Sequence, residues 1–176
     1  MGILIADIVQ VDTIKNEAGS VTTKGVLQVA SATKTDTFTT TSTSNVDVTG
    51  MTVATLTPRD ANSKFLIFGG VEWANSASGH VDFIQIVRII SGGATTEIAI
   101  NTDAGTSAHA TACGLHQINY ELTGSPFSFL DSPATTSDVT YKLQGRAGGN
   151  TMVVNRRGDG VDQGGVSTIT VMEIQG

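Results

Sequence analysis

The sequence predicts an all-β protein, a jelly-roll-like antiparallel sandwich with a short N-terminal docking segment, on three observations. Threonine is the commonest residue and glycine numbers 20 among 176 residues, a composition that favours strands joined by tight turns. Short apolar or alternating runs recur along the chain with Gly, Asp and Asn between them, as in strands connected by hairpins. Long stretches of Ala, Leu, Glu, Lys and Arg are few, so helices are poorly supported.

The length suggests one domain with a short appendage. We place the boundary so that residues 1–24 form a docking or oligomerisation segment and residues 25–176 form the sandwich. An exposed segment as apolar as the first would be an aggregation hazard, so we expect it to be buried against a partner subunit or a docking surface. The alternative is a first strand packed within its own sandwich. The large apolar residues of this segment are Ile3, Leu4, Ile5, Ile8, Val9, Val11 and Ile14.

The first strands of the sandwich are expected between residues 26 and 58. Residues 26–33 read as a strand. Residues 33–45 are a Thr/Ser run with Phe38 as its one apolar anchor, which predicts an edge strand leading into a solvated loop, or else a flexible linker. Residues 46–58 alternate between apolar and polar side chains and end in a turn at residues 58–62.

The most apolar strands are expected in the middle of the chain. Residues 63–73 read as a central strand with a bulge or bend at Gly69 and Gly70. Residues 81–90 are apolar on both faces, so this strand is expected to lie centrally or at a subunit interface. Residues 91–93 are expected to form a hairpin turn.

A long loop of small polar residues is expected at 101–114, followed by strands at 115–122 and 127–130. The last third of the chain holds three further strand-like runs separated by glycine-rich joints. We expect about nine to eleven strands in all, with the final run ending inside a sheet. The three runs cover residues 139–144, 151–155 and 167–174.

Charge and cysteine content exclude several classes of function. The formal net charge is -6, which disfavours nucleic acid and anionic membrane surfaces as partners. Cys113 is the only cysteine, so no intrachain disulfide forms and folding in a reducing cytoplasm is compatible. No signal peptide, myristoylation signal or membrane span is recognisable.

The sequence offers no catalytic residues, cofactor or metal, and we expect a protein that is not an enzyme. No G-x-S-x-G, H-E-x-x-H or P-loop pattern occurs. Zinc would need more donors than His109, Cys113 and His116 supply. Glycoside hydrolysis needs only two carboxylates, and the fold could bring together Asp131 with Asp138, or Glu72 with Asp82. The chain is short for such an enzyme, so we do not expect this activity.

Two loops, residues 74–80 and 101–114, are long, polar and rich in small residues, as recognition loops on a rigid sandwich are. Unremarkable solvent loops have the same composition. Aromatic and amide side chains suit sugars and protein partners, so the candidate ligand residues are Trp73, Asn75, His80, His109 and Tyr120. The tripeptide Arg157-Gly158-Asp159 spells an integrin-recognition motif, but we expect an ordinary glycine turn.

The order of four phrases in the last third carries a resemblance: L-D-S-P-A-T-T-S, V-T-Y-K-L-Q, N-T-M-V-V-N-R-R-G and S-T-I-T-V-M-E-I. They resemble the C-terminal domain of small tailed-phage virion proteins from aquatic and marine phages, many of which are labelled tail fibre or structural protein. The phrase V-D-T-I-K-N-E-A-G-S at residues 11–20 resembles their leader.

The resemblance implies a homotrimer on the virion surface, made in the bacterial cytoplasm and released by lysis, with phage capsid or tail proteins as partners. It leaves two roles open. One is capsid decoration or cementing, which the short chain favours because no residues remain for a shaft. The other is a short tail fibre or receptor-binding tip, for which a host-surface glycan is a further candidate partner.

Overall fold

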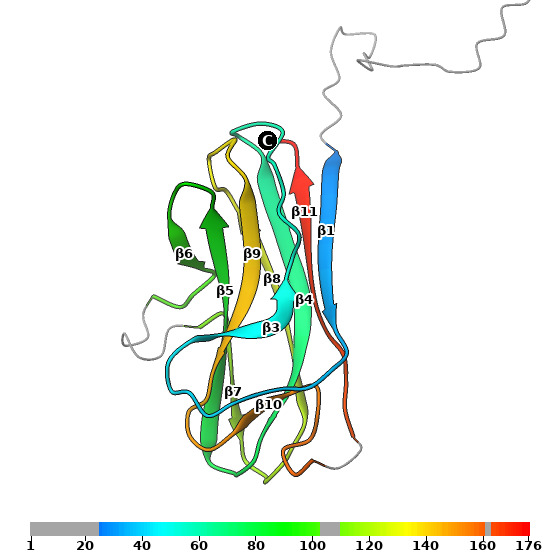
Figure 1. Cartoon of the computed structure of the whole chain (residues 1–176), viewed down its shortest axis with the longest axis vertical. Helices are drawn as coiled ribbons and strands as arrows, with labels where there is room; N and C mark the ends of the chain where they lie inside the picture. The colour runs from blue at the N-terminus through cyan, green and yellow to red at the C-terminus, as the bar shows by residue number, and fades with distance from the viewer. Residues whose placement is uncertain (1–24, 103–109, 161–162) are drawn as a thin grey trace, which may run out of the picture.

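The computed structural model describes residues 25–102, 110–160 and 163–176. Every regular element within these ranges is a strand, and the strands form two antiparallel sheets packed face to face (Figure 1). The all-β sandwich predicted from the sequence is therefore confirmed. The docking segment, residues 1–24, with its seven apolar residues, lies outside the described residues, so its boundary and its role stay predictions.

Six strands form the first sheet, which we call sheet A. β4 is central, with β8 along one edge, and with β11 and then β10 along the other. β1 pairs with the far side of β11 and β2 with the far side of β10. The strands are β1 (Val26–Lys34), β2 (Phe38–Thr40), β4 (Lys64–Asn75), β8 (Thr123–Asp131), β10 (Met152–Val154) and β11 (Ser167–Ile174).

Five strands form the second sheet, sheet B. β9 lies between β3 and β5, and the other edge of β5 pairs first with β7 and then with β6. The strands are β3 (Val46–Thr52), β5 (His80–Ile90), β6 (Thr95–Ile98), β7 (Ala112–His116) and β9 (Val139–Arg146).

The connections between the long strands define a jelly roll. The chain passes between the sheets from β1 to β3, β4, β5, β8, β9 and β11. The resulting order, β1-β11-β4-β8 facing β3-β9-β5 with β6 and β7, is that of two Greek keys folded over each other. The jelly-roll-like prediction is confirmed by this strand order.

The core lies between the sheets because the inward side chains of each strand alternate with outward ones. β9 and β11 show this most plainly, with buried residues at every second position. Phe65 of sheet A and Tyr141 of sheet B meet across the core with ring centroids 5.8 Å apart. The largest fully buried apolar side chains are Trp73, Tyr141, Phe65, Met51, Ile67, Ile84, Ile86, Leu143, Met152 and Ile169.

One expected bulge and two strand boundaries differ from the sequence-based expectation. The register of β4 against both neighbours runs without a bulge through Gly69, where a Cβ would overlap the backbone of Thr168; the glycine serves close strand approach. The strand expected at residues 115–122 instead spans Ala112–His116, and Tyr120 beyond it has φ of 66°. The strand expected at 46–58 ends at Thr52, and Gly50 within it adopts φ of 85°, where the pairing with β9 is interrupted between Asp47 and Thr52.

Other local predictions are confirmed. The Thr/Ser run forms β2, an edge strand that pairs only with β10 among the described strands. The turn at residues 91–93 joins β5 to β6, with Gly92 at φ of 69° and Gly93 N donating to Ile90 O at 2.9 Å. Eleven strands are described, the last ends at Ile174, and no helix in the described part is long and apolar enough to cross a membrane.

The strand that is apolar on both faces, β5, is central and is covered by its own chain. Ile84 and Ile86 point into the core. On its other face Gln85 and Val87 are each 1% exposed, and the guanidinium of Arg146 lies 4.1 Å from the ring centre of Phe83. The apolar character of this strand therefore needs no second subunit.

Candidate functional site

The five predicted ligand residues do not form one exposed site. Trp73 and Asn75 are fully buried at the end of β4, which corrects their assignment as direct ligand contacts, because a surface ligand cannot reach them. His80 and Tyr120 are partly exposed, and His109 lies outside the described residues. β4 ends and β5 begins at one end of the sandwich, opposite the end where the described chain starts at Gly25; we call these the distal and the proximal end (Figure 1). The four described residues lie at the distal end, because Trp73 and Asn75 are in the last part of β4, His80 begins β5, and Tyr120 N donates to Asn75 O.

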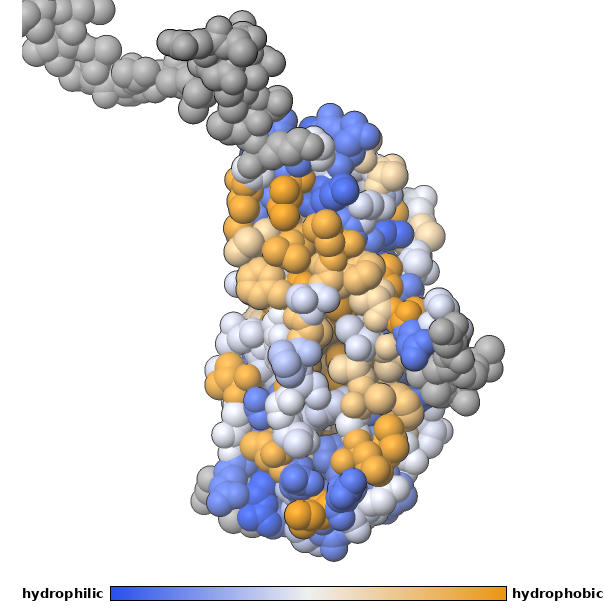
Figure 2. Space-filling view, turned by 180° about the vertical axis from the view of Figure 1, so that it is seen from behind, coloured by the Kyte–Doolittle hydropathy of each residue, from blue (hydrophilic) through white to orange (hydrophobic). Residues whose placement is uncertain are grey.

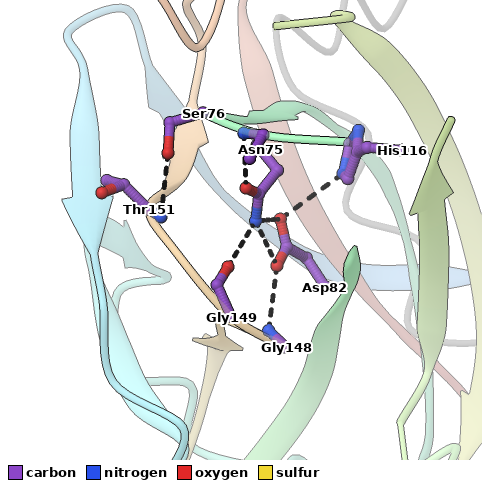
Figure 3. A network of polar contacts seen from close by, with 8 residues as sticks. Asn75, Ser76, Asp82, His116, Gly148, Gly149 and Thr151 are labelled. Carbon is purple, nitrogen blue, oxygen red and sulfur yellow. Dashed lines mark hydrogen bonds and ion pairs between the residues drawn. The ribbon is translucent and has the colours of Figure 1, made fainter. Parts of the chain in front are cut away.

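Beneath the distal loops, Asn75 and Asp82 form the centre of a buried polar network (Figure 3). Asn75 Nδ2 donates to both carboxylate oxygens of Asp82 at 3.0 Å and to Gly149 O at 2.9 Å. Gly148 N donates to Asp82 Oδ1 at 3.0 Å, and Asn75 Oδ1 accepts from Ala77 N at 3.0 Å. One amide and one carboxylate thus fasten the loops at 76–79 and 147–151 to each other.

His116, at the end of β7, closes this network from the side (Figure 3). Its Nε2 lies 3.4 Å from Asp82 Oδ2, and its ring meets Trp73 edge-on at a centroid distance of 6.1 Å. Asp82 is 0% exposed and His116 is 1% exposed. This pair has the residue types of an acid–base dyad, but a substrate cannot reach it, so we assign it a structural role.

Backbone hydrogen bonds connect the distal loops above the network. Tyr120 N donates to Asn75 O at 3.2 Å and Gly158 N donates to Tyr120 O at 3.5 Å, while Ser78 N donates to Asn119 Oδ1 at 2.7 Å. A surface hollow of about 300 Å³ is lined by Tyr120 and Arg157 among other residues. The loops thus form a connected platform.

The tripeptide at residues 157–159 lies in this platform as a closed turn. Arg157 Nη2 binds Asp159 Oδ2 at 2.8 Å, and Gly160 N donates to Arg157 O at 3.2 Å. The two charged side chains of the motif therefore bind each other within a turn, as expected. The expectation that Gly158 adopts positive φ is wrong: Gly160 has φ of 82°, and at Gly158 a Cβ would instead overlap Asn75 O.

The other candidate chemistry residues are separated or already hydrogen bonded. Cys113 is exposed and His116 is buried, and the described residues contain no group of three or more His, Cys, Asp or Glu arranged to hold a metal. Asp138 is exposed and accepts from Thr57 Oγ1 at 2.6 Å. In each predicted carboxylate pair, one member, Asp131 or Asp82, is buried and bonded within the protein.

Asp131 belongs to a second polar cluster, which joins the two sheets at the proximal end. Arg88 Nη1 of β5 reaches its two carboxylate oxygens at 2.8 and 2.9 Å, and Tyr141 Oη of β9 donates to Oδ2 at 2.8 Å. Burial, followed by the charge of Asp131, raises the pKa of Tyr141 well above its ordinary value. The phenol stays protonated and acts as a fixed donor.

The outer face of sheet A carries a group of apolar side chains at outward positions of its strands. One residue from each of four adjacent strands forms an apolar row across it: Val29 pairs with Met172, Met172 with Leu66, and Leu66 with Leu130. Val26 pairs with Ile174 on one side of this row, and Phe68 lies on the other. We call these seven residues, Val26, Val29, Leu66, Phe68, Leu130, Met172 and Ile174, the apolar patch.

The apolar patch is exposed at the proximal end (Figure 2). Val26, Val29 and Leu130 are 56%, 53% and 47% exposed. By strand register, the outward positions of β1, β11, β4 and β8 include only two charged residues, Lys64 and Glu72, at opposite ends of β4. No single run in the sequence signals this surface, because its residues come from four separate strands.

Comparison with known proteins gave no match to a protein-family model and none to a curated protein. Among solved structures, the chain is similar to infectious bursal disease virus Gx strain, with 15% identity, a TM-score of 0.43, and coverage of 99% of this chain and 46% of that one. It is similar to the VP2 subviral particle of that virus, with 14% identity, a TM-score of 0.44, and coverage of 95% and 46%. The chain spans less than half the length of these structures, and such low similarity carries no conclusion about function.

Proposed function

We propose that this chain is a non-enzymatic structural protein of a tailed-phage virion, a trimeric knob that decorates and cements the capsid exterior. The apolar patch carries this proposal, since a soluble domain rarely leaves such a surface uncovered unless another molecule covers it. The patch begins at Val26, directly after the apolar segment of residues 1–24. An apolar segment and an apolar face next to each other are suited to assembly.

Two further features support this proposal. The sequence phrases in residues 130–174 resemble small tailed-phage virion proteins, and jelly rolls are a common architecture of viral capsid domains as well as of lectins and cupins. The buried carboxylates of the described residues are bonded within the fold, as befits a structural part. Fold alone does not define function, so the assignment depends on the surface and on experiment.

The second candidate is a short tail fibre or receptor-binding tip. It is favoured by one observation, the connected distal platform with Tyr120 at φ of 66° beside a hollow. Non-glycine residues in this conformation are strained and concentrate at functional sites. A platform at the end opposite the start of the described chain at Gly25 is suited to contact with a receptor, and a host-surface glycan is the candidate partner.

Heating capsids with and without the protein tests the first role. A protein that binds only the assembled capsid stabilises it by mass action, by about 2 to 4 kcal/mol per site at saturation. We expect genome release to shift to higher temperature when the protein is added. No shift, together with blocked adsorption when purified protein competes for host cells, would replace decoration by receptor binding.

Deletion of residues 1–20 tests the docking role of the N-terminal segment. We expect the truncated protein to keep the circular dichroism spectrum of a folded β-sandwich, because the core of the described residues is closed without this segment, and to lose attachment to the particle. Co-sedimentation with particles measures attachment. An unfolded truncated protein would show that the segment is part of the core.

A further inference from the structure

We propose that the apolar patch on sheet A is the contact between copies of this chain, with the patches of three copies facing a common threefold axis. This inference rests on the proposed trimeric virion role and deepens it, because it separates the subunit contact from the particle contact. The patch binds sister subunits, and the N-terminal segment binds the particle. Three observations support a second copy as the occupant.

The first observation is the distribution of charge. The whole chain has a formal net charge of -6, so copies repel each other over most of their surface. The outward positions of β1, β11, β4 and β8 hold one lysine and one glutamate, Lys64 and Glu72. Copies can therefore approach most closely on this face.

The second observation is the extent of the face. Each side of a stable interface contributes about 20–30 residues, and the apolar patch alone is smaller than that. The row next to it, formed by Ser31, Thr170 and Ser128 around Phe68, is polar but uncharged. The two rows together are ten residues, which is fewer than a whole interface needs, and they supply its apolar centre and part of its polar rim.

The third observation is where the undescribed segment joins the sandwich. The described chain starts at Gly25, whose carbonyl accepts from Gln175 N at 3.2 Å at the proximal end of the sheet. Copies that turn their patches to one axis place the three Gly25 residues, to which the N-terminal segments are joined, at the same end of that axis. Three linked segments bind one particle site more tightly than one segment does, through effective concentration.

The alternative interface suggested by the sequence, the strand at residues 81–90, is closed within the monomer. Val87 on its outer face is 1% exposed, and the Arg146 side chain covers Phe83. The apolar surface that a partner subunit could cover is therefore on sheet A and not on sheet B.

Sedimentation equilibrium of the full chain tests the proposal, with Val29→Glu as the variant and Leu115→Glu as its control. Val29 and Leu115 have the same exposure, 53%, but Leu115 lies on β7 of sheet B. We expect a wild-type trimer of the 18.2 kDa chain. Val29→Glu should raise the dissociation concentration by about 30-fold or more, because it places a charge in the apolar row that the contact buries, and Leu115→Glu should leave it within about threefold.

Chemical cross-linking gives a measure that does not depend on weakening the protein. In a Cys113→Ser background, which removes the exposed thiol, Val29→Cys should form covalent dimers and trimers with a short bis-maleimide, and Leu115→Cys should not. A monomeric wild type, or equal behaviour of the two positions, would overturn the patch as the subunit contact. A dimer that Val29→Glu dissociates would keep the contact and overturn the threefold arrangement.

Neither negative result bears on the particle. Attachment of the wild-type chain to capsids and its loss on deletion of residues 1–20 test the virion role separately. A protein that attaches as a monomer would retain the proposed function and lose this inference. A trimer that Val29→Glu dissociates but that binds no particle would retain this inference and overturn the proposed function.

Discussion

Replacing Asp82 by alanine is expected to lower the free energy of unfolding by about 2–3 kcal/mol, because the buried amide of Asn75 loses both carboxylate oxygens that accept from it. Asn75 and Asp82 are 0% exposed. Gly148 N also donates to this carboxylate, but Gly148 is exposed, so water can replace that acceptor. An unsatisfied buried donor costs about 1–3 kcal/mol. Urea denaturation followed by circular dichroism measures the difference.

Asp138→Ala is the matched control for this substitution. Asp138 is an exposed carboxylate with a hydrogen bond from Thr57 Oγ1, so its loss should change the free energy of unfolding by less than about 1 kcal/mol. Hydrogen exchange should also show faster exchange at Ala77 and Gly148 in Asp82→Ala, because both amides bond to this network. Equal stability of the two variants would mean that the network does not hold the distal loops.

The class of fold could be predicted because it depends on local chemistry. The alternation of residues 139–144 is reproduced residue by residue in the burial of β9, since side chains of a strand point to opposite faces. Burial also alternates along β11, but there Ser167 and Glu173 are buried and Met172 and Ile174 lie on the outer face. The turn at residues 91–93 was equally readable, because glycine tolerates positive φ. Both signals lie within a few adjacent residues.

The candidate ligand site could not be predicted, because burial depends on contacts between residues distant in sequence. Asn75 looks like a loop amide in the sequence, yet its partners are Asp82 and Gly149, the latter contributed by the turn after β9. Trp73 has the residue type of a binding hot spot, but the alternation of β4 directs it into the core with Phe65 and Ile67. The sequence shows the type of each residue but not how deeply its side chain is buried.

The apolar patch could not be predicted for the same reason, because it is formed by residues distant in sequence. Leu66 alone reads as one more apolar residue of a central strand, and Met172 as one of a terminal strand. Only the strand register places them side by side with Val29 and Leu130. The sequence signal that was available, apolar residues at successive positions such as 65–68, indicated two covered faces but not what covers the second one.

Replacing Asp131 by alanine is the second large effect expected, a loss of about 3 kcal/mol in the free energy of unfolding. The carboxylate binds Arg88 of β5 and Tyr141 of β9 from its place at the end of β8, so the substitution removes a connection between the two sheets. Removing one partner of a buried ion pair costs about 3–5 kcal/mol. The side chain of Arg88 is 15% exposed and keeps some contact with water, which places the effect at the lower end.

Tyr141→Phe separates the hydrogen bond from the ion pair in this cluster. Its ring still packs against Phe65, and only the phenol donor to Asp131 is lost, so the expected loss is about 1 kcal/mol. Because the pKa of Tyr141 is raised, the phenol does not ionise over the range in which the domain is folded, and this difference should be constant from pH 6 to pH 9. A double-mutant cycle between Arg88→Met and Asp131→Ala, measured by urea denaturation, gives the coupling of the pair. Additive effects in that cycle would show that the Arg88 and Asp131 side chains stabilise the protein independently, and that their ion pair does not hold the two sheets together at this end.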